Sequence, residues 1–173
     1  NGTTNNSTTP VAVTSGALTN KTVTMSGAIA GKTVTNITAG GRHTCAVLSD
    51  GTAACWGNNW YGQLGNGTTN NSTTPVAVTS GALTNKTVTN ITAGSSHTCA
   101  VTSDGTAACW GYNYSGQLGN GTTTNSSTPV AVTSGALTNK TVTEITAGLH
   151  NTCAVTSDGT VACWGNNGYG QLG

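Results

Sequence analysis

The sequence predicts an all-β fold. Its 173 residues include no Phe and one Met, so the core must be built mainly from Val, Ala, Ile, Leu, Trp and Cys, small and β-branched residues that suit pleated sheets. Charged residues make up 5% of the chain, against about a quarter in typical soluble proteins. Thr, Asn, Ser and Gly must therefore form most of the surface.

The chain is a tandem repeat. Its cysteines occur in pairs that recur at one constant interval, and the surrounding sequence recurs with them. The three units are residues 1–65, 66–119 and 120–173, and the first contains an insert, residues 25–35, that partly duplicates the Lys-Thr-Val-Thr before it. Gly-Gln-Leu-Gly runs directly into Asn-Gly-Thr-Thr at both internal junctions. The same two segments stand at the two ends, so we expect molecules to associate end to end by sharing strands.

Each unit contains signals for several strands. Thr-Pro-Val-Ala-Val predicts a short strand that starts at Pro10, Pro75 and Pro129 and ends at a Ser-Gly pair. Val-Thr-Asn-Ile-Thr-Ala alternates apolar and polar residues, which is typical of a half-buried strand. His-Thr-Cys-Ala-Val and Ala-Ala-Cys-Trp-Gly then flank a Ser-Asp-Gly turn, in which Asp caps the turn and Gly supplies a positive φ. These last segments predict a hairpin.

The hairpin predicts how the cysteines pair. If residues 49–51 form a three-residue loop, counting outward places Cys45 opposite Cys55, and opposed residues lie close enough for a disulfide. The alternative is that the thiols are free and pack as small hydrophobic groups, which would suit a reducing compartment. We predict the disulfides Cys45–Cys55, Cys99–Cys109 and Cys153–Cys163.

Together these segments resemble the regulator of chromosome condensation repeat family, particularly its bacterial, cysteine-containing members. The resemblance rests on Ile-Thr-Ala-Gly, His-Thr-Cys-Ala-Val, Ser-Asp-Gly, Cys-Trp-Gly and Gly-Gln-Leu-Gly, and it covers nearly the whole chain three times. It implies a β-propeller of four-stranded blades, one repeat per blade and commonly seven blades. Family functions include nucleotide exchange on a small GTPase, chromatin contact and β-lactamase inhibition, and they depend on loops particular to each member.

Three units would leave the propeller ring incomplete within one chain, because a ring closes only when enough blades pack side by side. Three interpretations remain open. The chain is part of a longer protein, several chains share one ring, or the units stack into an open fibre.

No catalytic machinery is predicted. Turn formation explains the Asp of each Ser-Asp-Gly segment, and Glu144 has no second carboxylate as a partner. His43 and His97 occupy matching positions, but Asn151 replaces them in the third unit, and a metal site there would compete with the disulfides for the cysteines. We expect no enzyme activity, no metal and no cofactor.

The tryptophan of the Cys-Trp-Gly segment is the same in every unit, which indicates packing between blades. Other aromatic residues occupy variable positions just before Gly-Gln-Leu-Gly, where loops commonly carry contact residues. For each of these residues, packing between blades is as strongly expected as a role in binding. The candidate binding surface for a protein or a sugar is Trp60, Tyr61, Tyr112, Tyr114 and Tyr169.

The even number of cysteines favours an oxidising compartment, so we expect an extracellular or cell-surface location. An Asn- and Thr-rich repeat generates Asn-x-Ser/Thr triplets by chance as well as for glycosylation. The candidate glycosylation sites are Asn6, Asn20, Asn36, Asn71, Asn85, Asn90, Asn125 and Asn139. A net charge of +1 leaves no basic stripe for nucleic acid, and no apolar run approaches the roughly 20 residues that span a bilayer.

These features predict a non-enzymatic extracellular protein with a structural or adhesive role, which assembles through its repeats into a fibre or a multi-chain propeller. Self-association is therefore the expected mode of interaction. The alternative is that the chain is an excised part of a protein- or glycan-binding propeller module.

Overall fold

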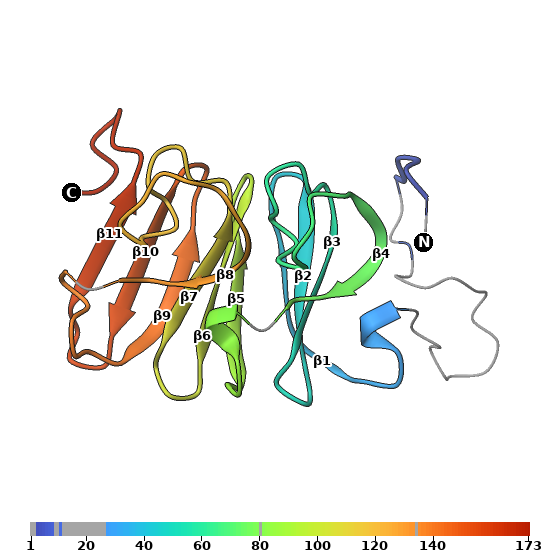
Figure 1. Ribbon diagram of the computed structural model, residues 1–173, viewed down its shortest axis with the longest axis horizontal. Helices are drawn as coiled ribbons and strands as arrows, with labels where there is room; N and C mark the ends of the chain where they lie inside the picture. Colours follow the sequence, from blue (N-terminus) through green and yellow to red (C-terminus); the bar gives the residue numbers. More distant parts are fainter. Residues whose placement is uncertain (1–2, 9–10, 12–26, 80, 134) are drawn as a thin grey trace.

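The computed structural model describes residues 3–8, 11, 27–79, 81–133 and 135–173. These residues form three antiparallel sheets that lie side by side along the long axis of the molecule (Figure 1). Sheet 1 comprises β1 (Val34–Ala39), β2 (His43–Leu48), β3 (Ala53–Gly57) and β4 (Ser72–Ala77). Sheet 2 comprises β5 (Val88–Ala93), β6 (His97–Thr102), β7 (Ala107–Gly111) and β8 (Ser126–Ala131). Sheet 3 comprises β9 (Val142–Ala147), β10 (Asn151–Thr156) and β11 (Val161–Gly165).

The all-β prediction is confirmed, and each sheet is a propeller-type blade whose strands pair in chain order. The sheets are out of phase with the sequence units. β4, which completes sheet 1, belongs to the second unit, and β8, which completes sheet 2, belongs to the third. Among the described residues, no fourth strand pairs with β11, and the three sheets form an open row and not a closed ring.

The proline-containing strands begin earlier than the sequence predicts. β4 starts at Ser72 and has Pro75 inside it, and β8 starts at Ser126 in the same way. Proline is tolerated there because each is the outermost strand of its sheet and needs no N–H for a further neighbour. The strand predicted to start at Pro10 lies outside the described residues.

The described part of the insert supplies regular elements of the first blade. Residues 27–29 form the 3-10 turn η1 (Gly27–Ile29), which matches η2 (Gly81–Leu83) before sheet 2. Residues 34 and 35 are the first residues of β1. Residues 27–35 therefore occupy the positions that residues 81–89 occupy in the next blade.

The predicted hairpin is present with the predicted register. Cys45 lies opposite Cys55, and Leu48 N donates to Thr52 O at 2.9 Å across the turn. Gly51 has a φ of 77°, as the three-residue loop requires. The structure contains the disulfides Cys45–Cys55, Cys99–Cys109 and Cys153–Cys163, which is the pairing that the hairpin geometry predicts.

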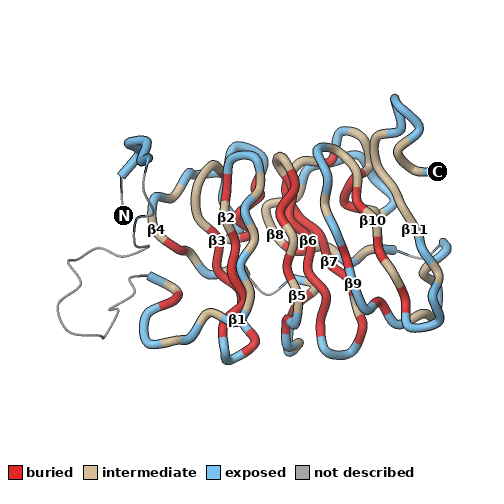
Figure 2. Tube along the Cα trace, turned by 180° about the vertical axis from the view of Figure 1, so that it is seen from behind, coloured by how far each residue is buried: buried red, intermediate tan, exposed pale blue. Residues whose placement is uncertain are grey.

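The hydrophobic core lies between neighbouring sheets. Figure 2 shows buried residues concentrated in β2, β3, β6 and β7, the inner strands of sheets 1 and 2, whereas β11 of sheet 3 has no buried residue. Cys45, Val47 and Leu64 from sheet 1 and its loop form one cluster with Ile91 and Trp110 from sheet 2. An equivalent cluster joins sheets 2 and 3. Each blade therefore depends on its neighbour for burial, as in repeat proteins generally.

The three disulfides differ in access to solvent, which gives a testable order of reduction. The first two are fully buried, whereas Cys153 and Cys163 are each partly exposed. Because exchange requires a thiolate to reach a sulfur atom, we expect a mild thiol reductant without denaturant to open Cys153–Cys163 first. Timed alkylation of dilute protein followed by peptide mass spectrometry measures the order. Equal rates for all three bonds would contradict this expectation.

Candidate functional site

The loops after β3 and β7 are each built around a buried asparagine. The side-chain amide of Asn59 donates to the carbonyl oxygens of Thr68 and Asn70 at 2.9 and 3.0 Å. Its Oδ1 accepts a hydrogen bond from Leu64 N at 2.9 Å. Asn113 makes the equivalent bonds in the second loop. Because these bonds satisfy backbone groups within the loop, the loops hold a fixed shape and present their other side chains outward.

Most positions at which the three units differ lie at this end of the sheets, the upper edge in Figure 1. In every unit, the backbone N–H that follows the Trp-Gly pair donates to the carbonyl before the second strand of the sheet. The pairs are Asn58 to Arg42 at 2.9 Å, Tyr112 to Ser96 at 2.9 Å and Asn166 to His150 at 2.8 Å. Both members of each pair vary between units. Repeated residues thus build most of each sheet, and most of the variable residues lie on the loop end.

Four aromatic rings from all three units meet on the loop end. The ring centroid of Tyr112 lies 4.8 Å from that of Tyr61, 6.1 Å from that of Tyr114 and 5.8 Å from that of His150. Tyr114 is 78% exposed, whereas Tyr112 is half-buried by its neighbours. We call Tyr61, Tyr112, Tyr114 and His150 the Tyr112 cluster. The sequence did not place His150 in this surface, although its position varies between units.

The two other predicted surface residues lie apart from the Tyr112 cluster. Trp60 is 61% exposed, and the guanidinium of Arg42 lies 6.0 Å from its ring centroid, a cation–π contact that extends the aromatic surface. Tyr169 is 97% exposed and makes no ring contact with any residue that the structure describes. The structure therefore brings three of the five predicted residues together, with a fourth in a separate contact.

Tyr112 departs from the repeat at a structural cost. At the equivalent positions, Asn58 Oδ1 accepts a hydrogen bond from Gln63 Nε2 at 2.7 Å, and Asn166 Oδ1 accepts one from Gln171 Nε2 at 2.9 Å. With tyrosine there, the buried Gln117 Nε2 has no acceptor among the described residues. Leaving a buried donor without a partner costs about 1–3 kcal/mol. The fold alone would favour asparagine at this position.

His43 and His97 lie between sheets and not in the loop surface. His43 Nε2 is 2.7 Å from Thr98 Oγ1, and this hydroxyl donates to Gln63 O at 2.8 Å. Because the hydroxyl hydrogen is used, His43 Nε2 must carry the proton. Burial lowers the pKa of His43 to about 4. The pKa of His97 is also lowered to about 4, mainly by burial and to a smaller extent by the nearby His43 and His150. Both rings are neutral at pH 7 and act as structural donors.

The turn aspartates are also structural. A lysine ammonium lies within 2.8 Å of each carboxylate in the pairs Lys32–Asp50, Lys86–Asp104 and Lys140–Asp158. The lysine bonds, followed by bonds from neighbouring threonines, hold the pKa of each carboxyl well below its usual range.

Within the described ranges, no three His, Cys, Asp or Glu side chains are placed to share a metal ion. The same residues include no helix long and apolar enough to cross a membrane.

The candidate glycosylation sites have different surroundings. Asn36 and Asn90 are half-buried, and Asn36 Nδ2 donates to Asn90 Oδ1 at 3.2 Å. Asn20 lies outside the described residues. The exposed candidates are Asn6, Asn71, Asn85, Asn125 and Asn139.

Sequence reasoning missed the asparagine at the centre of each loop. Asn59, Asn113 and Asn167 are identical in the three units, and Asn167 Oδ1 accepts a hydrogen bond from Leu172 N at 3.0 Å as its counterparts do. That identity was the available signal. It did not distinguish these residues from the many exposed asparagines around them.

Comparison with known proteins supports the same architecture. The regulator of chromosome condensation (RCC1) repeat model matches residues 50–101 and 104–155, and a second model of this repeat matches residues 34–63, 88–117 and 142–171. The Ultraviolet-B receptor UVR8 of Arabidopsis thaliana is 35% identical over 79% of the chain, and the human probable E3 ubiquitin-protein ligase HERC6 is 34% identical over 79%. The chain spans 30% and 13% of these two relatives.

Solved structures share the fold. Human WBSCR16 superposes with a TM-score of 0.73 at 24% identity, and the alignment covers 83% of this chain and 35% of that one. Prp20p of Saccharomyces cerevisiae superposes with a TM-score of 0.66 at 22% identity, covering 79% of this chain and 33% of that one. The two repeat models, which between them match most of the chain in three successive units, show that the chain belongs to the regulator of chromosome condensation (RCC1) repeat family.

Proposed function

We propose that the chain is a protein-binding propeller module and that the Tyr112 cluster is its binding surface. The observation that carries the proposal is Tyr112 itself. It occupies a position where the fold favours asparagine, leaves Gln117 Nε2 without an acceptor among the described residues, and forms the centre of four aromatic rings. A residue retained against local stability is expected where binding benefits from it.

The chemistry of the surface suits a protein partner with a neutral, partly apolar patch. Tyrosine provides large contact area and a hydroxyl at low cost in conformational entropy, and exposed aromatic clusters are typical anchors of interfaces. Similar propellers offer precedents, since yeast RCC1 (Prp20) has been crystallised bound to Kap60. Kap60 is a partner of that protein, and the partner of this chain is defined here only by the aromatic surface.

The substitution Tyr112→Asn separates binding from folding. It restores the acceptor that Asn58 provides in sheet 1, so we expect the free energy of unfolding to rise by about 1 kcal/mol. We also expect partner affinity to fall at least tenfold, as for a central interface residue. Urea denaturation measures the first effect, and calorimetric titration with the purified partner measures the second.

Finding the partner requires quantitative capture of cell-surface and secreted proteins of the source organism on the immobilised, unreduced chain. Capture should be strong with the unmodified chain, weak with Tyr112→Asn and unchanged with Tyr169→Ala, because Tyr169 lies outside the Tyr112 cluster. Equal capture by the unmodified chain and Tyr112→Asn would contradict the proposal. Retention of glycans and not proteins on an array would favour the glycan-binding alternative.

An extracellular structural role, in which chains assemble through their repeats, is the second candidate. Two observations favour it. The disulfides suit an oxidising compartment, and successive sheets pack on one another through equivalent apolar clusters. We propose an extracellular or cell-surface location on the same grounds.

A further inference from the structure

Neighbouring sheets are held together by packing and hydrogen bonds. In the joint between sheets 1 and 2, Gln63 O accepts hydrogen bonds from Trp110 Nε1 at 2.9 Å and from Thr98 Oγ1 at 2.8 Å. In the joint between sheets 2 and 3, Gln117 O accepts the equivalent bonds at the same two distances. Each of the three disulfides links the two strands of a single hairpin. Within the described residues, no disulfide therefore crosses a joint.

Two tyrosine rings meet across the joint between sheets 1 and 2. Tyr61 comes from the loop after β3, and Tyr112 comes from the loop after β7. Their ring centroids lie 4.8 Å apart, and the ring planes are tilted by 59°. Aromatic rings at this separation and tilt are in edge contact. The two phenols therefore touch although they belong to different units of the repeat.

Both tyrosines are held at this contact by their backbones. Tyr61 N donates to Gln63 Oε1 at 3.0 Å, and Tyr112 N donates to Ser96 O at 2.9 Å. The buried asparagine of each loop fixes the rest of the loop. Groups held side by side react as if at a very high local concentration. A reaction between the two phenols is therefore favoured over a reaction of either phenol with another molecule.

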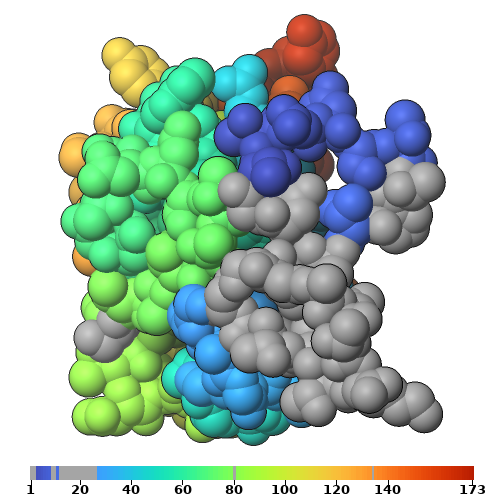
Figure 3. All heavy atoms as spheres, turned by 90° about the vertical axis from the view of Figure 1, so that its right-hand side faces the viewer, coloured from blue at the N-terminus to red at the C-terminus, as the bar shows by residue number. Residues whose placement is uncertain are grey.

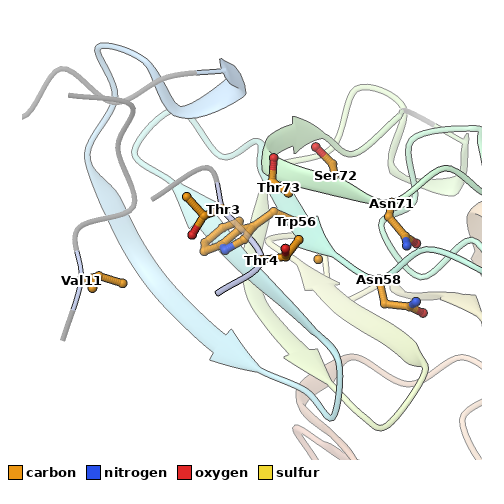
Figure 4. Close-up of a pocket in the computed structure, with 9 residues that line it drawn as sticks. Thr3, Thr4, Val11, Trp56, Asn58, Asn71, Ser72 and Thr73 are labelled. Atoms are coloured by element: carbon orange, nitrogen blue, oxygen red, sulfur yellow. The ribbon is translucent and has the colours of Figure 1, made fainter. Parts of the chain in front are cut away.

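The tyrosine pair lies inside the row of sheets, because the loops of sheets 1 and 2 form it between them. Its contact does not depend on what adjoins the first or the last sheet. The pocket beside Trp56 is different, since it lies on the first sheet, where Thr3 and Thr4 line it together with the indole ring (Figure 4). Figure 3 shows this end of the molecule, with β4 (green) and residues 3–8 (dark blue) in the foreground. The described lining of this pocket contains no tyrosine.

The ring of Tyr114 connects the pair with solvent. Tyr114 belongs to the middle sheet and is 78% exposed. Its ring is stacked on that of Tyr112, with the centroids 6.1 Å apart and the planes within 13° of parallel. Because an electron passes readily between aromatic rings in contact, an oxidant that takes an electron from Tyr114 oxidises Tyr112 in turn.

The geometry selects Tyr61 as the ring that bonds to Tyr112. Coupling of two tyrosines joins ring edges, at the carbon next to the hydroxyl-bearing carbon of each phenol. The ring of Tyr61 is the closer one and is tilted so that edges meet. The ring of Tyr114 is farther away and stacked. Tyr169, the remaining tyrosine of the chain, makes no ring contact with any residue that the structure describes.

We infer that Tyr61 and Tyr112 are a site of oxidative coupling, at which hydrogen peroxide and a haem peroxidase form a dityrosine bond across the joint between sheets 1 and 2. The inference goes beyond the proposed function, because the reaction needs no binding partner. It suits the proposed extracellular location, where the disulfides also indicate oxidising conditions. The bond ties together two sheets that the disulfides leave unlinked.

The reaction balances in atoms and electrons. Each phenol loses one electron and the proton of its hydroxyl group, which gives two tyrosyl radicals. A carbon–carbon bond then forms between the two rings, and the hydrogen on each bonded carbon moves to the phenolic oxygen, so that both rings become aromatic again. Hydrogen peroxide accepts the two electrons and two protons and leaves as two molecules of water. The product is lighter than the starting chain by two hydrogen atoms.

Treatment of the dilute, unreduced chain with hydrogen peroxide and a haem peroxidase tests the inference. We expect the blue fluorescence of dityrosine to appear while the chain stays at its monomer mass of 17.0 kDa. Lys86 lies between the two tyrosines, so trypsin places them on different peptides. After reduction of the disulfides, mass spectrometry should find these two peptides linked.

Phenylalanine substitutions identify the rings, because each keeps the ring and removes the phenol. Tyr61→Phe and Tyr112→Phe should each abolish the linked peptide pair. Tyr169→Phe should leave its yield unchanged, and Tyr114→Phe should give the same pair more slowly. Circular dichroism checks that every variant folds. In urea with the disulfides reduced, the yield should fall at least about tenfold, because the fold no longer holds the rings together.

Three results would overturn the inference. These are a bond formed only between Tyr112 and Tyr114 on one peptide, a product made mainly of chains linked to one another, and an equal yield from the folded and the unfolded chain. Partner binding to the Tyr112 cluster is measured without an oxidant. Failure of the coupling therefore leaves the proposed function standing, and failure of partner binding leaves the coupling site standing.

Discussion

Replacing Trp110 with alanine is expected to lower the free energy of unfolding by about 3–5 kcal/mol, the range measured for fully buried aromatic residues. Trp110 is completely buried between sheets 1 and 2, and its Nε1 donates to Gln63 O at 2.9 Å. The substitution removes this bond and leaves a cavity at the joint. Chemical denaturation of the variant and the unmodified chain measures the loss.

Two matched variants show whether the joint is the cause. Trp110→Phe keeps one aromatic ring but removes the N–H donor and part of the indole volume, so we expect a smaller loss than for Trp110→Ala, about 2 kcal/mol. Trp56→Ala removes the equivalent residue of sheet 1, which is half-buried, and should destabilise the single molecule far less than Trp110→Ala. Equal losses from Trp56→Ala and Trp110→Ala would show that packing between sheets does not determine the effect.

Acidification from pH 7.5 to 5 is expected to lower the stability by about 4 kcal/mol in total, because two histidines must stay neutral in the fold. Burial lowers the pKa of His43 and of His97 to about 4, whereas histidine in an unfolded chain titrates near 6.5. Below pH 6.5 the unfolded chain therefore binds protons that the folded chain does not. Stability falls between pH 6.5 and 4 and levels off below pH 4. Urea titrations at several pH values measure this slope.

The third unit provides the control for this prediction. Asn151 stands on sheet 3 at the position of His43 and His97, so the double substitution His43→Asn and His97→Asn uses a residue that the repeat already contains. We expect the double variant to lose most of the stability change between pH 7.5 and 5, whatever its absolute stability. The aspartates do not interfere with this measurement. Their pKa values are lowered in the fold, so the stability that their ionisation contributes is lost only below about pH 4. An unchanged slope would contradict the assignment to these histidines.

Much of the blade could be predicted from the sequence because its signals are local. A Ser-Asp-Gly turn fixes the register of its hairpin, and this register placed Cys45 opposite Cys55. Period-two alternation likewise marked β1, β5 and β9. The sequence predicts a start of β4 that is too late, at Pro75, because proline usually bounds a strand, whereas an outermost strand accommodates it.

The Tyr112 cluster was harder to predict because it depends on contacts between units. Tyr61, Tyr112 and Tyr114 were recognised as variable aromatic residues, but only the packing of adjacent sheets brings the first two within 4.8 Å. His150 has no local signal that links it to Tyr112. The cost of tyrosine at position 112 also became visible only through the hydrogen bonds that Asn58 and Asn166 make in the other units.

The central proposal is that the Tyr112 cluster binds a protein partner. Cryo-electron microscopy of the unreduced chain with its captured partner tests this most directly. We expect the partner to cover Tyr112 together with Tyr61 and Tyr114, whose rings adjoin it in the free chain. A partner bound on any other surface, with Tyr112 left exposed, would contradict the proposal.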